Sequence, residues 1–240
     1  MTPGRAEDVA AGSVRQSLGR YRRRRPLPAL VILALLGVLA TFVWSKIFNT
    51  VDDVEAAVRC DAPPPVTAAA EPGKEPPKPY TGQGQPRDAL DKTEAWPTSD
   101  IRVRVLNGGG LRGQAKLVNE ELIGFGFNKA GEPDDDPVYG NKLTCHGQLR
   151  YGPNGAGAAR TMSLLAPCVQ LVRDDRQESS IDLVLGKKFD GIKPSPSTRG
   201  LIDKLKEWAE QQPERGGQQA APPPPQLDGE LLAAARNVHC

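Results

Sequence analysis

The stretch that decides the fold runs from Asp100 to Phe125 and reads DIRVRVLNGGGLRGQAKLVNEELIGF. Its first part alternates apolar Ile101, Val103 and Val105 with polar neighbours, which predicts a strand with one buried face. Three glycines then turn the chain. Apolar residues follow at spacings of four, three, four and three, which predicts an amphipathic helix: Leu111, Ala115, Val118, Leu122 and Phe125.

Similar patterns continue over a length that suits one small domain, residues 100–191. We expect a short strand near Phe127, an acidic loop at 132–137, strands at 144–151, 168–173 and 181–185, and a helix at 158–165. This order predicts an α/β (α+β) fold with a small sheet of four to five strands covered by two helices.

Composition excludes several classes of protein. The 25 glycines and 23 prolines among 240 residues require linker segments, and the remainder is too short for a TIM barrel or a full dinucleotide-binding enzyme. Residues 1–26 hold seven arginines and two acidic residues, whereas the chain from Asn49 onward has 23 basic and 27 acidic residues. The slight excess of acidic residues from Asn49 onward argues against a nucleic-acid partner.

An uncharged run of 20 residues separates Arg25 from Lys46, long enough to cross a bilayer. We predict a single transmembrane helix at 26–48 that precedes the domain, with a helix at 49–60 continuing outside the membrane. The arginines at 20–25 predict a cytoplasmic tail at 1–25 and an extracytoplasmic C-terminal domain. A cleaved signal peptide is the alternative, but its apolar region is usually shorter.

The flanks of the domain are rich in proline. Residues 61–99 are interpreted as a linker that sets the distance of the domain from the membrane. Residues 192–240 contain a predicted helix at 198–212, the proline run 222–225 and a short terminal helix that begins near Leu227.

Four cysteines lie on the predicted outer side, where disulfides form: Cys60, Cys145, Cys168 and Cys240. Of the three possible pairings we favour Cys145–Cys168 with Cys60–Cys240. A zinc site built with His146 and His239 is the alternative, but the ligand spacing does not suit it, and no metal or cofactor is expected.

The glycine turn fits G-x-G-x-x-G through Gly108, Gly110 and Gly113, between a strand and a helix. A nucleotide site would need a larger domain, so we interpret the glycines as a tight turn. An anion, sugar or peptide site on the same amides stays open. Its candidate ligand-binding residues are Asn107, Gly108, Gly109, Gly110, Arg104, Arg112 and Arg150.

Two motifs carry a family resemblance. VRVLNGGGLRGQA at 103–115 and LVLGKKF at 183–189 resemble the start and end of the LytR C-terminal domain, with Gly109 where Ser is common and Lys188 where Asp is common. With the predicted anchor, linker and cysteines, the chain resembles the envelope integrity protein Cei family, which implies a single-pass protein needed for cell-envelope integrity. The resemblance supplies no catalytic residues. The LytR-CpsA-Psr phosphotransferase domain that precedes this domain in many relatives is not found before Asp100.

Three functions follow as hypotheses. The first is a non-enzymatic binding or scaffold protein of the cell envelope, whose ligand is a wall polymer, a lipid or an envelope protein. The second is a hydrolase or transferase that acts on wall polymers through the carboxylates of 134–136 and 174–175. The third is an accessory subunit of an envelope or division complex. Because the sequence contains no G-x-S-x-G, H-E-x-x-H or P-loop motif, we favour the first.

Overall fold

The structure is a computed structural model that describes residues 27–65, 80–212, 225–238 and 240. The predicted cytoplasmic tail at 1–25, residues 66–79 of the predicted linker and residues 222–224 of the predicted proline run at 222–225 lie outside the described residues. The chain divides into two compact units, residues 1–47 and 48–240.

Helix α1 (Leu27–Val58) begins in the first unit and continues into the second. It joins the two helices predicted at 26–48 and 49–60 into one. Its large apolar side chains from Leu30 to Trp44 are exposed. Among the described residues, no helix is both long enough and apolar enough to cross a bilayer, and the transmembrane helix predicted at 26–48 is not found there.

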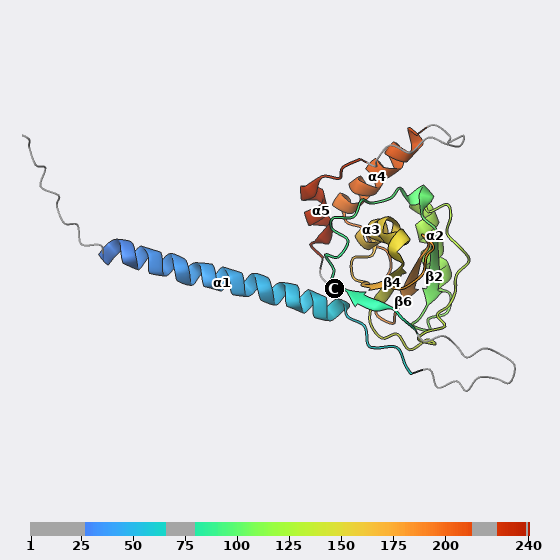
Figure 1. The fold of residues 1–240 in the computed structure, drawn as a ribbon, viewed down its shortest axis with the longest axis horizontal. Coiled ribbons are helices and arrows are strands. Elements are labelled where there is room, and N and C mark those ends of the chain that lie inside the picture. The colour runs from blue at the N-terminus through green and yellow to red at the C-terminus, as the bar shows by residue number, and fades with distance from the viewer. Residues whose placement is uncertain (1–26, 66–79, 213–224, 239) are drawn as a thin grey trace, which may run out of the picture. The chain divides into compact units, whose positions relative to one another are not determined.

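The second unit is built on a six-stranded mixed sheet, whose strands lie in the order β1-β5-β4-β6-β2-β3. Strands β2, β4 and β6 are labelled in Figure 1. Strand β2 is parallel to β3 and β6, β4 is parallel to β5, and the β4–β6 and β1–β5 pairs are antiparallel. The strands are β1 (Gln83–Gln85), β2 (Val103–Asn107), β3 (Asp134–Asp135), β4 (Gly147–Tyr151), β5 (Gln170–Arg173) and β6 (Ile181–Leu185).

Helices α2 (Gln114–Gly124) and α3 (Ala156–Leu165) cover one face of this sheet. The predicted alternation explains why, since Val103, Val105 and Leu183 project to that face and are almost fully buried. Helix α2 supplies Ala115, Val118 and Leu122 to this core, and α3 supplies Ala158, Met162 and Leu165. The α/β fold predicted with two covering helices is confirmed.

The C-terminal helices form a further layer next to α3 (Figure 1). Helix α4 (Pro196–Glu210) begins at Ser195, whose hydroxyl accepts a hydrogen bond from the Thr198 amide at 3.1 Å. Helix α5 (Gly229–Arg236) is capped in the same way by Asp228. Both helices lie close to their predicted positions, and Leu201 and Ala235 are buried where they pack with Leu164 of α3.

The sheet has more strands than predicted, and two of them lie in unexpected places. No strand forms at Phe127, which is a core residue, and β3 forms instead within the acidic loop. Strand β1 and the buried Leu90 lie within the predicted linker at 61–99, so the domain includes residues from Tyr80 onward. Both strands are held by backbone hydrogen bonds to a neighbouring strand. Such bonds require no particular pattern of side chains, so the sequence does not reveal these two strands.

Candidate functional site

The second face of the sheet carries the polar groups from which a site could be built. Gln148 and Arg150 of β4 and Asp182 of β6 point away from the helices, because they alternate with Leu149 and Leu183 of the core. All three are at most 5% exposed, since loops cover this face. We call this surface the polar face and define it by Gln148, Arg150 and Asp182.

A buried ion pair lies at the centre of the polar face. Arg150 donates from Nη1 to Asp136 Oδ1 at 2.6 Å and from Nη2 to Asp136 Oδ2 at 3.1 Å, and its Nε donates to Gln148 Oε1 at 3.1 Å. Both charged side chains are almost completely buried. The Arg150 guanidinium also lies 4.9 Å from the ring centre of Tyr80 and 5.7 Å from that of Tyr139. Asp136 therefore neutralises Arg150, and the arginine serves the fold rather than an open anion site.

Burial and charge set the pKa values of these groups. Burial has the largest single effect on the pKa of Arg150 and would lower it, but the hydrogen bonds to Asp136 and the charges around the guanidinium together outweigh burial and raise that pKa. Burial raises the pKa of Tyr80 to about 12, against the opposing effect of Arg150, and it also raises the pKa of Tyr139. Arginine stays charged and both tyrosines stay neutral at physiological pH.

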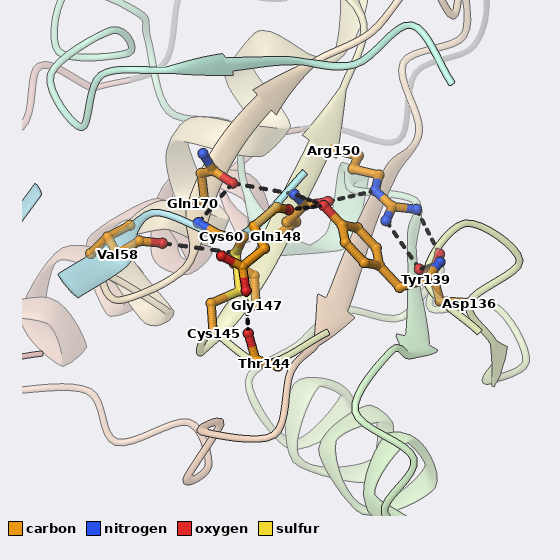
Figure 2. The surroundings of a disulfide bond; sticks show 11 residues. Val58, Cys60, Asp136, Tyr139, Thr144, Cys145, Gly147, Gln148, Arg150 and Gln170 are labelled. Carbon is orange, nitrogen blue, oxygen red and sulfur yellow. Dashed lines mark hydrogen bonds and ion pairs between the residues drawn. A yellow bond between two sulfur atoms is a disulfide. The ribbon is translucent and has the colours of Figure 1, made fainter. Parts of the chain in front are cut away.

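Hydrogen bonds connect this ion pair to a disulfide (Figure 2). Gln148 Nε2 donates to the Tyr139 hydroxyl at 3.1 Å and to Gln170 Oε1 at 3.2 Å. Gln170 Oε1 also accepts from the Cys60 amide at 3.3 Å, and the Tyr139 hydroxyl donates to the Asp61 carbonyl at 2.8 Å. These hydrogen bonds form a network that holds the segment after α1 against β4 and β5.

The structure confirms that all four cysteines form disulfides, but the favoured pairing is wrong. The bonds join Cys60 to Cys145 and Cys168 to Cys240, with Cα atoms 5.1 and 5.4 Å apart. Cys145 and Cys168 each precede one of the parallel strands β4 and β5. Cys145 pairs with the segment just after α1, and Cys168 pairs with the C-terminus. The spacing of the cysteines in the sequence does not indicate these partners. Since Cys145 and Cys240 belong to different disulfides, they cannot supply a zinc site, and His239 lies outside the described residues.

The Cys60–Cys145 bond changes the role of the predicted linker. It closes a loop with a sequence separation of 85 residues, so the shortest covalent path from α1 to strand β4 runs through the disulfide and not along residues 61–99. The linker therefore does not set the distance between α1 and the domain. In the chain-entropy account, a loop of this length stabilises the fold by about 4.5 kcal/mol.

The glycine turn is engaged within the chain. The Gly108 amide donates to the Leu185 carbonyl at 2.9 Å, and the Gly110 amide donates to Asn107 Oδ1 at 2.9 Å. A Cβ atom on Gly109 would lie 2.7 Å from the backbone of Gly186, and Gly110 has a φ of 84°. These contacts favour the tight-turn interpretation, because two of the amides that could hold a ligand already have partners.

The predicted arginines do not gather at this turn. Arg104 binds Asp182 through Nε at 3.2 Å, Arg150 is buried with Asp136, and Arg112 is exposed before α2. Asp182 also binds Arg176 at 2.8 Å, and Arg176 binds Asp174 at 2.7 Å. The structure thus brings Arg104 and Arg150 to adjacent positions on either side of Asp182 in the sheet.

The loop carboxylates considered for hydrolysis also have partners. Asp136 and Asp174 are paired with arginines, Asp135 accepts from the Asn107 side chain, and Asp175 accepts from the Thr81 hydroxyl. Within residues 27–65, 80–212, 225–238 and 240, no three His, Cys, Asp or Glu side chains group to hold a metal ion.

Sequence reasoning missed the glutamines and tyrosines of the network. Gln148 could have been found, because it precedes Leu149 and Arg150 on a strand whose alternation places it beside Arg150. Tyr80, Tyr139 and Gln170 gave no such signal, since their contacts join segments far apart in the sequence.

Comparison with known proteins adds three likenesses. The profile of the family described as LytR cell envelope-related transcriptional attenuator matches residues 100–189. The cell envelope integrity protein Cei of Mycobacterium tuberculosis is 33% identical over 205 residues, which cover 84% of this chain and 90% of that protein. A crystal structure of the soluble domain of a conserved hypothetical secreted protein from Mycobacterium marinum is similar with a TM-score of 0.55 at 32% identity, and the match covers 66% of this chain and 98% of that one.

Proposed function

This chain belongs to the family of the cell envelope integrity protein Cei. From that premise we propose that it is a membrane-tethered, extracytoplasmic binding or scaffold protein that supports the integrity of a bacterial cell envelope. We propose further that it has no enzymatic activity. The family resemblance drawn from the two sequence motifs agrees with this membership. The proposal places the domain outside the cytoplasm, as the secreted relative from M. marinum and the two disulfides suggest.

The observation that carries the proposal is the Cys60–Cys145 bond at the end of α1. Upstream of this bond lie 20 uncharged residues, and the large apolar side chains from Leu30 to Trp44 in α1 are exposed. Such a surface is suited to contact with lipid, which is why we assign residues 26–48 to the membrane. The disulfide then keeps the domain two residues from the end of α1.

The absence of enzymatic activity is proposed from how the polar groups are used. Arg150, Asp136 and Gln148 bind one another within a buried network that also binds the segment after α1. A catalytic acid or base has to reach its substrate, and buried, neutralised groups such as these do not. A binding role needs only a stable surface held at a fixed place.

The experiment is complementation in a bacterium whose own Cei relative has been deleted, with uptake of a membrane-impermeant dye as the readout. We expect the full chain to restore dye exclusion, and the same chain with residues 26–48 replaced by an unrelated anchor to restore it equally. An exported form that lacks residues 1–47 should fail, because the tether is missing.

A variant of the exposed carboxylates, Asp134→Asn with Asp135→Asn, should also restore dye exclusion. Loss of function in this variant at normal protein level would favour the hydrolase or transferase. Full activity of the untethered form would contradict the proposed membrane role. An alkaline phosphatase fused after Cys240 should be active, because this enzyme works only outside the cytoplasm, and an inactive fusion would contradict the proposed topology.

A further inference from the structure

An open cleft of about 630 Å³ lies where β2 and β6 begin, next to the polar face. Two segments of opposite charge line it. The start of β2 and the loop before β3 contribute Arg102, Arg104 and Lys129, whereas the loop between β5 and β6 contributes Asp175 and Glu178. The cleft therefore presents positive and negative groups from separate parts of the chain.

Buried Asp182 fixes the geometry of this cleft. Its side chain is 7% exposed and binds both Arg104 and Arg176, at 3.2 and 2.8 Å. Arg176 is neutralised further by Asp174, whose carboxylate contacts it at 2.7 Å. These charges keep their positions without a ligand, which reduces the entropy lost when a ligand binds.

Some groups in the cleft remain open to a ligand. The Arg104 side chain is 53% exposed, and its Nη1 makes no hydrogen bond within the described part of the chain. Arg102 is exposed and contacts the Ser179 hydroxyl at 3.1 Å. Glu178 is exposed and, among the described residues, has no hydrogen-bond or ion-pair partner.

The composition of the lining limits the chemistry of the ligand. Four cationic and four acidic side chains balance, so neither a polyanion nor a polycation is favoured: Arg102, Arg104, Lys129, Arg176, Asp174, Asp175, Glu178 and Asp182. The lining contains no aromatic side chain for stacking on a sugar ring, and its one apolar residue, Val103, has its side chain buried in the core, so the cleft offers no apolar surface for an acyl chain.

We propose that this cleft binds a short peptide that carries both free carboxylates and free ammonium groups, the chemistry of the peptide stems of a bacterial cell wall. A ligand carboxylate meets Arg102 and Arg104, and a ligand ammonium meets Glu178. This inference rests on the proposed function, because the envelope location supplies peptides of this kind.

The test is calorimetric titration of the full chain in detergent with a synthetic tetrapeptide, L-alanyl-D-glutamyl-meso-diaminopimelyl-D-alanine. We expect saturable binding, and no binding of the same peptide with its amines acetylated and its carboxylates amidated. Glu178→Gln and Arg102→Gln should each weaken binding about threefold to fivefold, the effect of one solvent-accessible charge pair. The matched variants Glu207→Gln and Arg199→Gln change exposed residues of α4 and should bind as the unchanged chain does.

Three outcomes would overturn the proposal: no saturable binding, equal binding of the blocked peptide, or equal weakening by the α4 variants. Tighter binding of inorganic polyphosphate than of the tetrapeptide would overturn it as well. If the chain binds no tetrapeptide yet restores dye exclusion in the complementation experiment, the cleft assignment fails and the proposed function stands.

Discussion

Arg150 shows how one residue connects the polar side of the sheet. A guanidinium that is 3% exposed would be very unfavourable without a counter-charge, and Asp136 supplies it through two hydrogen bonds. Its remaining surface contacts Gln148 and two aromatic rings. Removal of Asp136 would therefore leave Arg150 buried without its counter-charge.

The first prediction concerns Asp136→Ala in a chain that begins at residue 48. We expect the free energy of unfolding to fall by about 3–5 kcal/mol at pH 7, because the change leaves Arg150 buried without its counter-charge. Denaturation in urea measures it. Asp190→Ala is the control, since its ion pair with Lys193 is mostly exposed and contributes about 0–1 kcal/mol. Equal losses in the two variants would contradict the importance of the buried pair.

A second prediction concerns pH. The pKa of Tyr80 in the folded chain is about 12 and lies above its unfolded value near 10, so folding favours the neutral phenol. Its contribution to stability is complete below pH 10 and is lost as the pH rises towards 12. Tyr80→Phe should therefore weaken the decrease in unfolding free energy between pH 10 and 12. Tyr139 keeps part of that decrease, because burial raises its pKa too. An unchanged pH profile in Tyr80→Phe would refute the assignment.

At the scale of elements, long segments with strong patterns were predicted well and short ones were not. The alternation in β2 and β6 and the helical spacing in α2 to α5 are properties of side chains, which sequence displays directly. Strands β1 and β3 read Gln-Gly-Gln and Asp-Asp, and depend on backbone bonds to β5 and β2. Among the candidate site residues, Arg104 and Arg150 were found as charged positions on strands, but their partners come from loops that no local pattern places.

The third prediction tests whether residues 80–99 belong to the domain. Leu90 is 3% exposed in the main core, so Leu90→Ala should lower the free energy of unfolding by about 2–5 kcal/mol. Leu111→Ala is the matched control, because Leu111 is 52% exposed and its truncation should cost less than about 1 kcal/mol. Thermal or urea denaturation compares the two variants. If Leu90→Ala is as mild as the control, this segment is a linker as the sequence suggested.

At the scale of the whole molecule, the disulfides connect distant parts of the chain. Their sequence separations are 85 and 72 residues, and each joins a flanking segment to the loop before a central strand. Composition predicted that the cysteines form disulfides but not which ones pair, because each pairing depends on where the sheet places its loops. Both bonds hold parts of the chain outside residues 100–191 on the domain.

The fourth prediction distinguishes the two pairings. Protease sites are inserted within residues 66–79 and within residues 213–224, and the chain is cut at both. Without a reductant, the observed pairing keeps all three fragments covalently joined through the middle one. Pairing of Cys145 with Cys168 and of Cys60 with Cys240 would instead release the middle fragment. Non-reducing electrophoresis separates these results, and reduction should free every fragment in both cases.

The Cys60–Cys145 bond also decides how mechanical force passes through the protein. If α1 is fixed and the domain is pulled away by whatever it binds, tension travels through the sulfur atoms to the residues just before β4. Strand β4 lies in the interior of the sheet and is paired on both edges, so the load is shared by two neighbouring strands from the outset. The proline-rich segment after Cys60 carries none of that tension while the disulfide is intact. It would be stretched and carry the load only after the disulfide is reduced.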